Sequence, residues 1–357
     1  MAYTTIDDPS AHFQTKIYTG TGSSLALTFG GNSDLQPDFV WVKSRTNAYS
    51  HYIYDSTRGV QKRLLTDANS AESTLAQGLT AFGSDGMTFG TDAGANESSD
   101  AHVVLGWKAN GGTTTTNDAS STGVGSEDTV YQANTTAGFS IVTWTGPSGS
   151  GVDTRAHGLG AVPHVILVKA RTGTENWVMY HHKNTSAPET DVLKLNSANG
   201  TADESGNWND TAPTSTVFTS GDTGATNEDS KTYVAYIWTE IQGYSKFGSY
   251  TGNGNADGTF VYTGFKPSLI IQKQTSADGE YWMMKDSTRE PHNLVDANLY
   301  PNSTHAEGDT NAMDFLSNGF KCRTSGAGSN ASGATYIYIA FAEHPFVSSK
   351  GVPCTAR

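Results

Sequence analysis

The feature that most limits how this chain can fold is an internal pattern that occurs three times. Each copy begins with a strand-like segment that ends in an aromatic residue, a threonine and a glycine. These tripeptides are Tyr18-Thr19-Gly20, Trp144-Thr145-Gly146 and Tyr250-Thr251-Gly252. Several landmarks that recur in one order along a chain indicate tandem repeats of one structural unit.

A proline and a nearly continuous apolar run ending in lysine follow each tripeptide. These runs are residues 37–43, 163–169 and 267–273. Apolar residues on both faces of a short β-prone segment predict a central strand that is covered on both sides. Because proline lacks the N–H that a sheet requires, we expect it only at the first position of each strand.

A second aromatic strand leads into the tetrapeptide Asp-Ser-Thr-Arg in the first and third copies, from Asp55 to Arg58 and from Asp286 to Arg289. Asp and Arg three residues apart around a turn commonly pair with each other, so these four residues are predicted to form a structural turn motif. Both copies then reach a Leu-x-Asp-Ala-Asn segment, residues 65–69 and 294–298. Residues 195–199 keep a weaker trace in the second copy, which has His181 and His182 in place of the tetrapeptide.

Each copy closes with an Asn-containing loop and an alternating strand, at residues 102–107, 232–238 and 335–341. Asp85-Gly86 and Asn318-Gly319 precede two of these strands and predict hairpin turns with a positive φ at glycine. Helical spacing is scarce, and residues 71–79 are the best candidate for one or two helical turns. The pattern predicts an all-β protein of three tandem β-sandwich domains, of jelly-roll or lectin-like type, with little helix.

The domain boundaries follow from these landmarks and from composition. We expect an N-terminal arm at 1–14, β-sandwich repeats at 15–111, 137–243 and 244–346, and a C-terminal tail at 347–357. Residues 112–136 are rich in Gly, Thr and Ser and are expected to be a linker, whereas the second and third copies should form a stiffer pair. Six tryptophans fall at repeat positions and are predicted to pack in the cores: Trp41, Trp107, Trp144, Trp177, Trp238 and Trp282.

The charge balance argues against several classes of partner. The chain has 22 Lys and Arg against 35 Asp and Glu, a net charge of -13, so a nucleic-acid partner is not expected. No apolar run is long enough to span a membrane, and the first eight residues predict no secretory signal. Cys322 and Cys354 lack a metal-binding spacing and are expected to be two unbonded thiols.

The search for catalytic chemistry leaves two alternatives open. A pair of carboxylates such as Asp286 and Glu343 could serve glycoside hydrolysis, but sequence alone does not bring them together. His181 and His182 could bind a metal with a nearby carboxylate, although adjacent side chains on a strand point to opposite faces. We therefore predict no catalytic, cofactor-binding or metal-binding residues, no cofactor and no enzymatic activity.

One tryptophan lies outside the repeated positions. Trp208 sits in a polar loop of the second copy, among Asn and Asp residues. An exposed indole in such a loop is a reasonable contact for a glycan or protein receptor, whereas a lid over its own domain is the structural alternative. Trp208, His181 and His182 are therefore the candidate residues for a recognition surface.

Longer stretches of the chain carry a resemblance to a known class of proteins. Residues 5–16, 134–142 and 157–160, and the third copy throughout, from 243–248 to 340–346, resemble structural virion proteins, usually described as tail-fibre or structural proteins, of tailed bacteriophages from marine bacteria. The resemblance implies a virion component assembled in the host cytoplasm, in a tail fibre or receptor-binding element with tandem concanavalin A-like sandwiches. It implies no catalytic or ligand residues, because the shared motifs are strand and turn positions.

Three functional hypotheses follow. The first is a non-catalytic virion protein that attaches to the host surface, where repeated weak contacts add to firm binding. The second is a capsid decoration or tail connector protein that grips other virion subunits through the arm at 1–14, and the third is a glycan depolymerase. By analogy with tail fibres we expect a homo-oligomer, preferably a trimer, with other virion subunits and a host-surface glycan or protein as partners.

Overall fold

The structure is a computed structural model that describes residues 2–149 and 151–353. Within these residues nearly all regular structure is strand, which confirms the predicted all-β class. The α-helices of the described residues have four residues each: α1 (Ala93–Asn96), α2 (Ala119–Thr122) and α3 (Ala327–Asn330). The helix expected at 71–79 is wrong, because Ser73 and Thr74 there pair with strand β5 instead.

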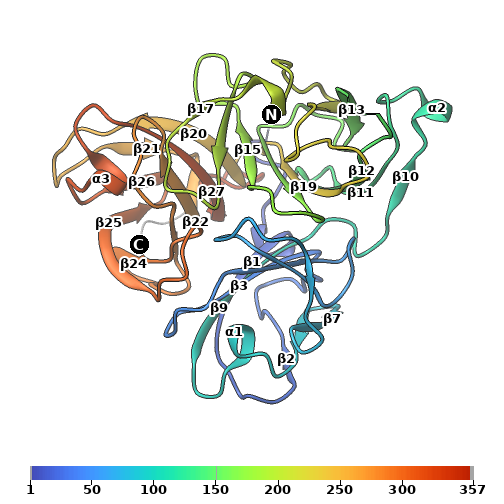
Figure 1. The fold of residues 1–357 in the computed structure, drawn as a ribbon. Helices are drawn as coiled ribbons and strands as arrows, with labels where there is room; N and C mark the ends of the chain where they lie inside the picture. The colour runs from blue at the N-terminus through green and yellow to red at the C-terminus, as the bar shows by residue number, and fades with distance from the viewer. Residues whose placement is uncertain (1, 150, 354–357) are drawn as a thin grey trace.

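The strands form three modules: β1 to β9 (residues 13–107), β10 to β19 (115–238) and β20 to β27 (245–345). Figure 1 shows the three modules grouped around the middle of the molecule. Each module has an antiparallel main sheet, and the three sheets share four strands in the same order. In module 1 the order is β1 (Phe13–Thr19), β9 (Ala101–Trp107), β3 (Phe39–Ser44), β4 (Tyr52–Asp55), β5 (Lys62–Leu65) and β6 (Ser73–Thr74). In module 2 it is β10 (Thr115–Asn117), β11 (Thr129–Asn134), β12 (Phe139–Thr145), β19 (Thr232–Trp238), β14 (Val165–Ala170), β15 (Val178–His181), β16 (Asp191–Lys194) and β17 (Ala202–Asp203). In module 3 it is β20 (Ser245–Thr251), β27 (Thr335–Pro345), β22 (Phe265–Gln274) and β23 (Met283–Asp286).

A second sheet covers the outer face of each main sheet and completes a sandwich. It has fewer strands than the main sheet in modules 1 and 2 and the same number in module 3. Its strands are β2 (Leu25–Leu27), β8 (Gly86–Phe89) and β7 (Leu79–Gly83) in module 1, β13 (Asp153–Ala156) and β18 (Val217–Ser220) in module 2, and β21 (Phe260–Tyr262), β26 (Gly319–Cys322), β25 (Gly308–Leu316) and β24 (Val295–Asn298) in module 3. Both predicted hairpins are present, as β7–β8 and β25–β26. Gly86 has the expected positive φ of 108°, whereas Gly319 does not have a positive φ, so that part of the prediction is wrong for the second hairpin.

The apolar runs form β3, β14 and β22, the third of the four strands that the main sheets share, and are buried on both faces, as predicted. In β3, Phe39 and Trp41 face the centre of the molecule, whereas Val40 and Val42 face the smaller sheet of module 1. β14 and β22 divide their residues between the two cores in the same alternating way. Pro267 is an exception to the expected position, since it lies inside β22 at a β-bulge, where the ladder is already irregular.

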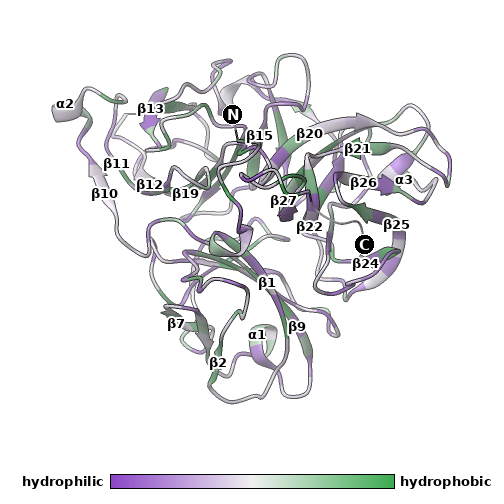
Figure 2. Ribbon diagram, turned by 180° about the vertical axis from the view of Figure 1, so that it is seen from behind, coloured by the Kyte–Doolittle hydropathy of each residue, from purple (hydrophilic) through white to green (hydrophobic). Residues whose placement is uncertain are grey.

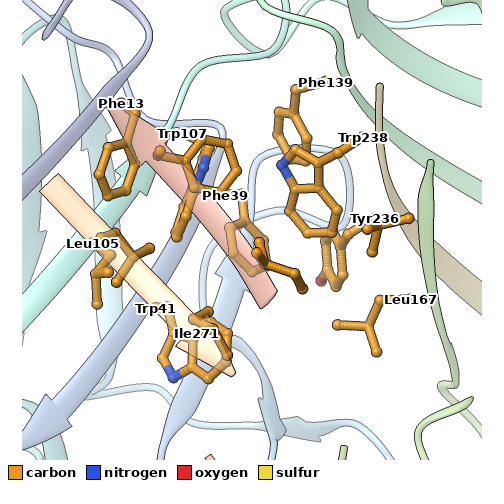
Figure 3. Packing of buried hydrophobic residues seen from close by; sticks show 14 of the residues in the cluster. Phe13, Phe39, Trp41, Leu105, Trp107, Phe139, Leu167, Tyr236, Trp238 and Ile271 are labelled. Atoms are coloured by element: carbon orange, nitrogen blue, oxygen red, sulfur yellow. The ribbon is translucent and has the colours of Figure 1, made fainter. Parts of the chain in front are cut away.

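The inner faces of the three main sheets meet in one shared core. Figure 3 shows side chains of module 1, such as Phe39 and Trp107, packed against Trp238 of module 2 and Ile271 of module 3. The ring centroids of Phe39 and Tyr236, from different modules, are 4.4 Å apart. Figure 2 shows hydrophobic stretches on strands of all three modules where they approach this centre. Each module therefore has its own outer core but depends on the other two for its inner face.

The six tryptophans at repeat positions are all buried, as predicted, with at most 7% of any residue exposed. The glycine of each aromatic-Thr-Gly tripeptide is required for the same steric reason. A Cβ on Gly20, Gly146 or Gly252 would lie 2.1–2.2 Å from a backbone carbonyl oxygen of the loop before the closing strand. Only glycine allows the chain to approach that closely.

Two segments expected to be peripheral are integrated into the fold. Residues 112–136, expected as a linker, contain β10, α2 and β11, and these strands extend the main sheet of module 2. In the expected arm at 1–14, Ile6 is 3% exposed in the shared core and Thr4 Oγ1 donates to the carbonyl of Gln242. Strand β1 begins inside that segment, at Phe13.

The repeated Leu-x-Asp-Ala-Asn segments occupy different places in modules 1 and 3. Asp67 accepts a hydrogen bond from the backbone N–H of His51, at the start of β4. The residue that does so before β23 is Asn302, not Asp296 of the repeated segment, and its counterpart before β15 is Asn196. The sequence match is therefore out of register with the structure, because strand pairing, and not local sequence similarity, determines which positions are equivalent.

Candidate functional site

The Asp-Ser-Thr-Arg motifs lie at the junctions between modules. Arg58 and Asp55 form an ion pair with no exposed side-chain surface, and Asp55 Oδ1 also accepts the backbone N–H of Arg58 at 2.8 Å. The Tyr236 hydroxyl of module 2 donates to Asp55 at 2.7 Å. Burial of the Arg58 guanidinium lowers its pKa, but Asp55, Tyr236 and Glu72 together outweigh this effect and keep the pKa above its usual value. The predicted pairing is confirmed.

A glutamate extends this pair across the junction of modules 1 and 2. Glu72 Oε2 accepts from Arg58 at 2.8 Å and from Arg171 of module 2 at 2.9 Å. The backbone N–H of Glu72 also donates to the carbonyl of Arg171 at 2.8 Å. Burial raises the pKa of Glu72, but its hydrogen bonds and charge interactions with Arg171 and Arg58 have the larger combined effect and lower it.

The junction of modules 3 and 1 has the same four-residue network. Asp286 and Arg289 form a fully buried ion pair, and Arg289 Nη1 lies 2.8 Å from Glu307. Glu307 in turn binds Arg45 of module 1 through two hydrogen bonds of 2.7 and 2.9 Å. Its backbone N–H donates to the Arg45 carbonyl at 2.8 Å, as at the first junction.

The junction of modules 2 and 3 has neutral residues at all four positions. Strand registers place His181 where the other modules have Asp55 and Asp286. Asn184, three residues later, takes the place of the arginine, and its side-chain oxygen accepts from Thr201 at 2.6 Å. The backbone N–H of Thr201 donates to the Thr275 carbonyl at 2.9 Å, so these two threonines replace the glutamate and the second arginine. No unpaired buried charge results, because the four charges are replaced together.

His181 and His182 both make contacts inside the molecule. His181 is 1% exposed, and its Nε2 lies 3.2 Å from the Tyr338 carbonyl of module 3. Burial lowers the pKa of His181 to about 3, so its ring is neutral and Nε2 donates. His182 is partly exposed, with Nε2 2.6 Å from the Phe247 carbonyl and 3.6 Å from Glu240. Both histidines therefore join modules 2 and 3, and only His182 reaches the surface.

Trp208 is buried, contrary to the expectation of an exposed indole. It is 2% exposed, packs edge-on against Tyr180 at 6.1 Å and donates from Nε1 to the Asp191 carbonyl at 3.2 Å. The apolar ring fills the outer core of module 2 while its N–H finds a backbone acceptor. The loop is polar, but its one aromatic residue faces inward. The indole therefore covers its own domain, as the structural alternative predicted.

The carboxylates considered for chemistry also have internal partners. Asp286 is held by Arg289, whereas Glu343 forms an ion pair with Lys266 at 2.7 Å. Within residues 2–149 and 151–353, no group of three His, Cys, Asp or Glu side chains could hold a metal. Burial raises the pKa of Cys322 to about 11, so its thiol is protonated, and Cys354 lies outside the described residues.

The lysines that end the second and third apolar runs are junction residues that the sequence reading missed. Lys169 donates to the Asn69 carbonyl of module 1 at 3.1 Å, and Lys273 donates to the Ala198 carbonyl of module 2 at 3.0 Å. Burial lowers the pKa of Lys43, Lys169 and Lys273 to about 8. The sequence signal for this shared buried position is the lysine that occurs at the same place in all three runs.

A polar cavity of about 500 Å³ lies beside the neutral junction. Its wall combines the N-terminal segment at Tyr3, His164 of module 2, the connection to module 3 at Glu240 and Gln242, and the end of β21 at Tyr262. Sequence reasoning placed a recognition surface at the adjacent His182 but missed these residues, because they come from segments that are far apart in the chain. This cavity is the candidate binding site.

The part of the chain that the structure describes contains no helix long and apolar enough to cross a membrane. A search of curated proteins found no match. Residues 8–345 match a family described as Domain of unknown function (DUF7483). The matched span includes all three modules, in agreement with one unit built around a shared core, and the chain therefore belongs to the DUF7483 family.

Proposed function

We propose that the protein is a non-catalytic structural component of a phage virion that contacts the host surface, in a tail fibre or receptor-binding element. The virion assignment rests on the resemblance of residues 5–16 and 340–346 to structural proteins of tailed bacteriophages. The attachment role rests on the geometry, in which three sandwiches close around one core and present their outer loops to solvent. Such a scaffold displays surface without a large change of shape.

The observation that carries the non-catalytic proposal is that the buried charged groups pair with one another. Asp55 and Asp286 are compensated by Arg58 and Arg289 inside closed junctions, where no substrate reaches them. Glu343 pairs with Lys266 rather than with a second carboxylate. A hydrolase needs two carboxyl groups that share access to one bond, and these residues do not provide that arrangement.

The N-terminal segment favours host attachment over the connector alternative. Tyr3 Oη donates to the Gly264 carbonyl at 2.8 Å, and Asp7 accepts from the backbone N–H of Ser349 at 2.6 Å. Together with Thr4 and Ile6, these contacts hold the segment against its own chain. Residues that grip a neighbouring subunit would have to leave those contacts first.

The test uses the purified chain and the host bacterium. The fluorescently labelled protein should bind host cells and reduce virion adsorption when added in excess, and host polysaccharide should show no new reducing ends. Absence of both cell binding and competition would contradict the attachment role, whereas release of reducing ends would contradict the non-catalytic assignment. Locating the chain in a map of the intact particle distinguishes fibre from capsid.

The homotrimer expected for a fibre stays a prediction. The three modules of one chain already bury their inner faces, so a trimer would have to form through outer surfaces. Mass measurement in solution and a copy number from the particle map test it, and a monomer in both would contradict it.

A further inference from the structure

We propose that the cavity between Tyr3, His164, Gln242 and Tyr262 binds a neutral pyranose unit of a glycan. The inference rests on the proposed attachment function and specifies the site and the class of ligand. A cavity of about 500 Å³ lies in the size range of small-ligand sites. It lies where three parts of the chain meet, which is a frequent place for such sites.

Tyr262 provides an aromatic face at the rim. Tyr262 is 53% exposed. Among the large hydrophobic residues that are exposed in the described part of the chain, no other aromatic is as exposed. Phe260, two positions earlier on β21, is 45% exposed and lies on the same side of the strand, whereas Val261 between them is buried. Aromatic rings that remain exposed beside a polar cavity suit the C–H face of a sugar ring, which is apolar while its edge carries hydroxyls.

The hydroxyls of the two tyrosines are arranged to accept a hydrogen bond. Tyr3 Oη donates to the Gly264 carbonyl at 2.8 Å and lies 3.1 Å from Tyr262 Oη. Because the Tyr3 proton is used by the carbonyl, Tyr262 must donate to Tyr3. The lone pairs of Tyr262 Oη then remain as acceptors for a ligand hydroxyl.

The opposite wall supplies donors. His164 Nδ1 accepts the backbone N–H of Glu240 at 3.1 Å, so in the neutral ring the proton is on Nε2. Burial lowers the pKa of His164 to about 4, which keeps the ring neutral at physiological pH. Gln242 is exposed, and no hydrogen bond of its side chain occurs within the described residues. Its amide therefore offers both a donor and an acceptor.

The charges in the wall cancel and favour a neutral ligand. Glu240 accepts from Lys246 at 2.8 Å and from the backbone N–H of Phe247 at 2.8 Å. Burial raises the pKa of Glu240, but hydrogen bonds from His182 and Lys246 outweigh burial and lower it to about 2, so the pair is ionised and balanced. An anionic sugar would meet the Glu240 carboxylate, and a cationic one the Lys246 ammonium.

The binding test uses defined sugars and four proteins. Saturation-transfer NMR is recorded with maltotriose, cellotriose and triacetylchitotriose as neutral probes and trigalacturonate as the acidic probe. We expect the wild-type chain to bind at least one neutral probe with a millimolar Kd. Tyr262→Ala should weaken that binding by about tenfold or more, whereas Tyr262→Phe should keep most of it.

Tyr281→Ala is the matched control, because Tyr281 is also a partly exposed tyrosine of module 3 but packs against Tyr300 and His305, away from the cavity. Its binding should equal that of the wild type. Binding of no neutral probe, preference for trigalacturonate, or equal loss in Tyr262→Ala and Tyr281→Ala would overturn the proposal. Far-UV circular dichroism and thermal melting establish that each variant is folded before it is titrated.

Host-cell labelling separates this inference from the attachment role. If wild type and Tyr262→Ala label host cells equally, the cavity is not the attachment site but the protein still attaches. If neutral sugars bind through Tyr262 and cells are not labelled, the cavity proposal stands and the attachment role fails.

Discussion

Asp55 and Arg58 have no exposed side-chain surface, so each charge depends on the other for its compensation. Removing one partner of such a pair leaves the other charge buried, where neither water nor an opposite charge stabilises it. The surface pair of Lys321 and Asp257 is different, because Asp257 is 71% exposed and water solvates its charge. The same chemical change should therefore have very different effects at the two places.

Arg58→Met is expected to lower the free energy of unfolding by about 3–5 kcal/mol, because Asp55 loses its buried counter-charge. Lys321→Met is the matched control and should change it by less than about 1 kcal/mol. Urea denaturation followed by tryptophan fluorescence measures both. Equal effects of the two substitutions would contradict the role assigned to burial.

Lys285 is a buried cation without an ion-pair partner among the described residues. It is 1% exposed, and its Nζ donates to the Thr310 carbonyl at 3.0 Å. Burial, with a smaller contribution from Arg289, lowers the pKa of Lys285 to about 7. Between that value and about 10.4, the ordinary pKa of lysine, the folded state binds fewer protons than the unfolded state. The Lys285 contribution to stability therefore rises with pH over this range.

Lys285→Met should raise the free energy of unfolding at pH 7 by about 1–3 kcal/mol, since an apolar side chain of similar volume avoids the desolvation cost. The variant should also lose part of the increase in stability between pH 7 and 10. Denaturation curves at several pH values measure this slope. Identical slopes in wild type and variant would count against a depressed lysine pKa.

At the scale of elements, the three junctions use one backbone arrangement with two kinds of side-chain network. The bond from Glu72 N–H to the Arg171 carbonyl has counterparts at Glu307 and Thr201. The ionic networks and the neutral set of His181, Asn184, Thr201 and Thr275 are alternative ways to satisfy one geometry. Residues in one network are expected to be strongly non-additive.

Replacing the first ionic network by the neutral set tests this non-additivity. The quadruple variant Asp55→His, Arg58→Asn, Glu72→Thr and Arg171→Thr should be more stable than Arg58→Asn alone, although it changes three more residues. Chemical denaturation of the two variants provides the comparison. A quadruple variant whose loss equals the sum of its single changes would contradict the proposed coupling.

At the scale of the whole molecule, the shared core joins modules that the repeats alone would make independent. Phe39, Trp238 and Ile271 come from three modules and lie in one cluster (Figure 3). A truncated chain would expose the apolar inner faces of the remaining main sheets. Stability should therefore be cooperative over all three modules.

A chain that ends at residue 243 lacks module 3 and is expected not to fold stably. The full chain should unfold in one main transition. Circular dichroism and calorimetry measure both properties. A soluble truncated chain with a sharp melting transition of its own would show that modules 1 and 2 form a separate domain.

Acid should destabilise the whole molecule through its buried histidines. Burial lowers the pKa of His102 and His157 to about 4 and that of His181 to about 3. An unfolded histidine titrates near 6.5, so the unfolded state binds more protons below that pH and the stabilisation is lost as pH falls toward 4. The free energy of unfolding should decrease from pH 7 to pH 4.5, and His181→Asn should reduce the decrease. A flat profile over this range would contradict the prediction.

Local patterns in the sequence predicted the strands, the hairpin turns, the buried tryptophans and the pairing of Asp55 with Arg58. Each depends on residues close together in the chain: alternation along a strand, glycine in a turn, or opposite charges three positions apart. The sequence reading failed at residues 112–136, whose Gly and Thr content suggested a linker, because pairing between β11 and β12 outweighs local composition.

The remaining features depend on contacts between distant residues. Whether Trp208 faces solvent depends on Tyr180 and the outer core of module 2, and the candidate cavity exists because Tyr3 meets Tyr262. The repeats alone do not distinguish three separate sandwiches from three joined ones, since an apolar inner face can be covered by any suitable partner. The tertiary structure decides this, because it is the burial of all three inner faces against one another that removes their apolar surface from water.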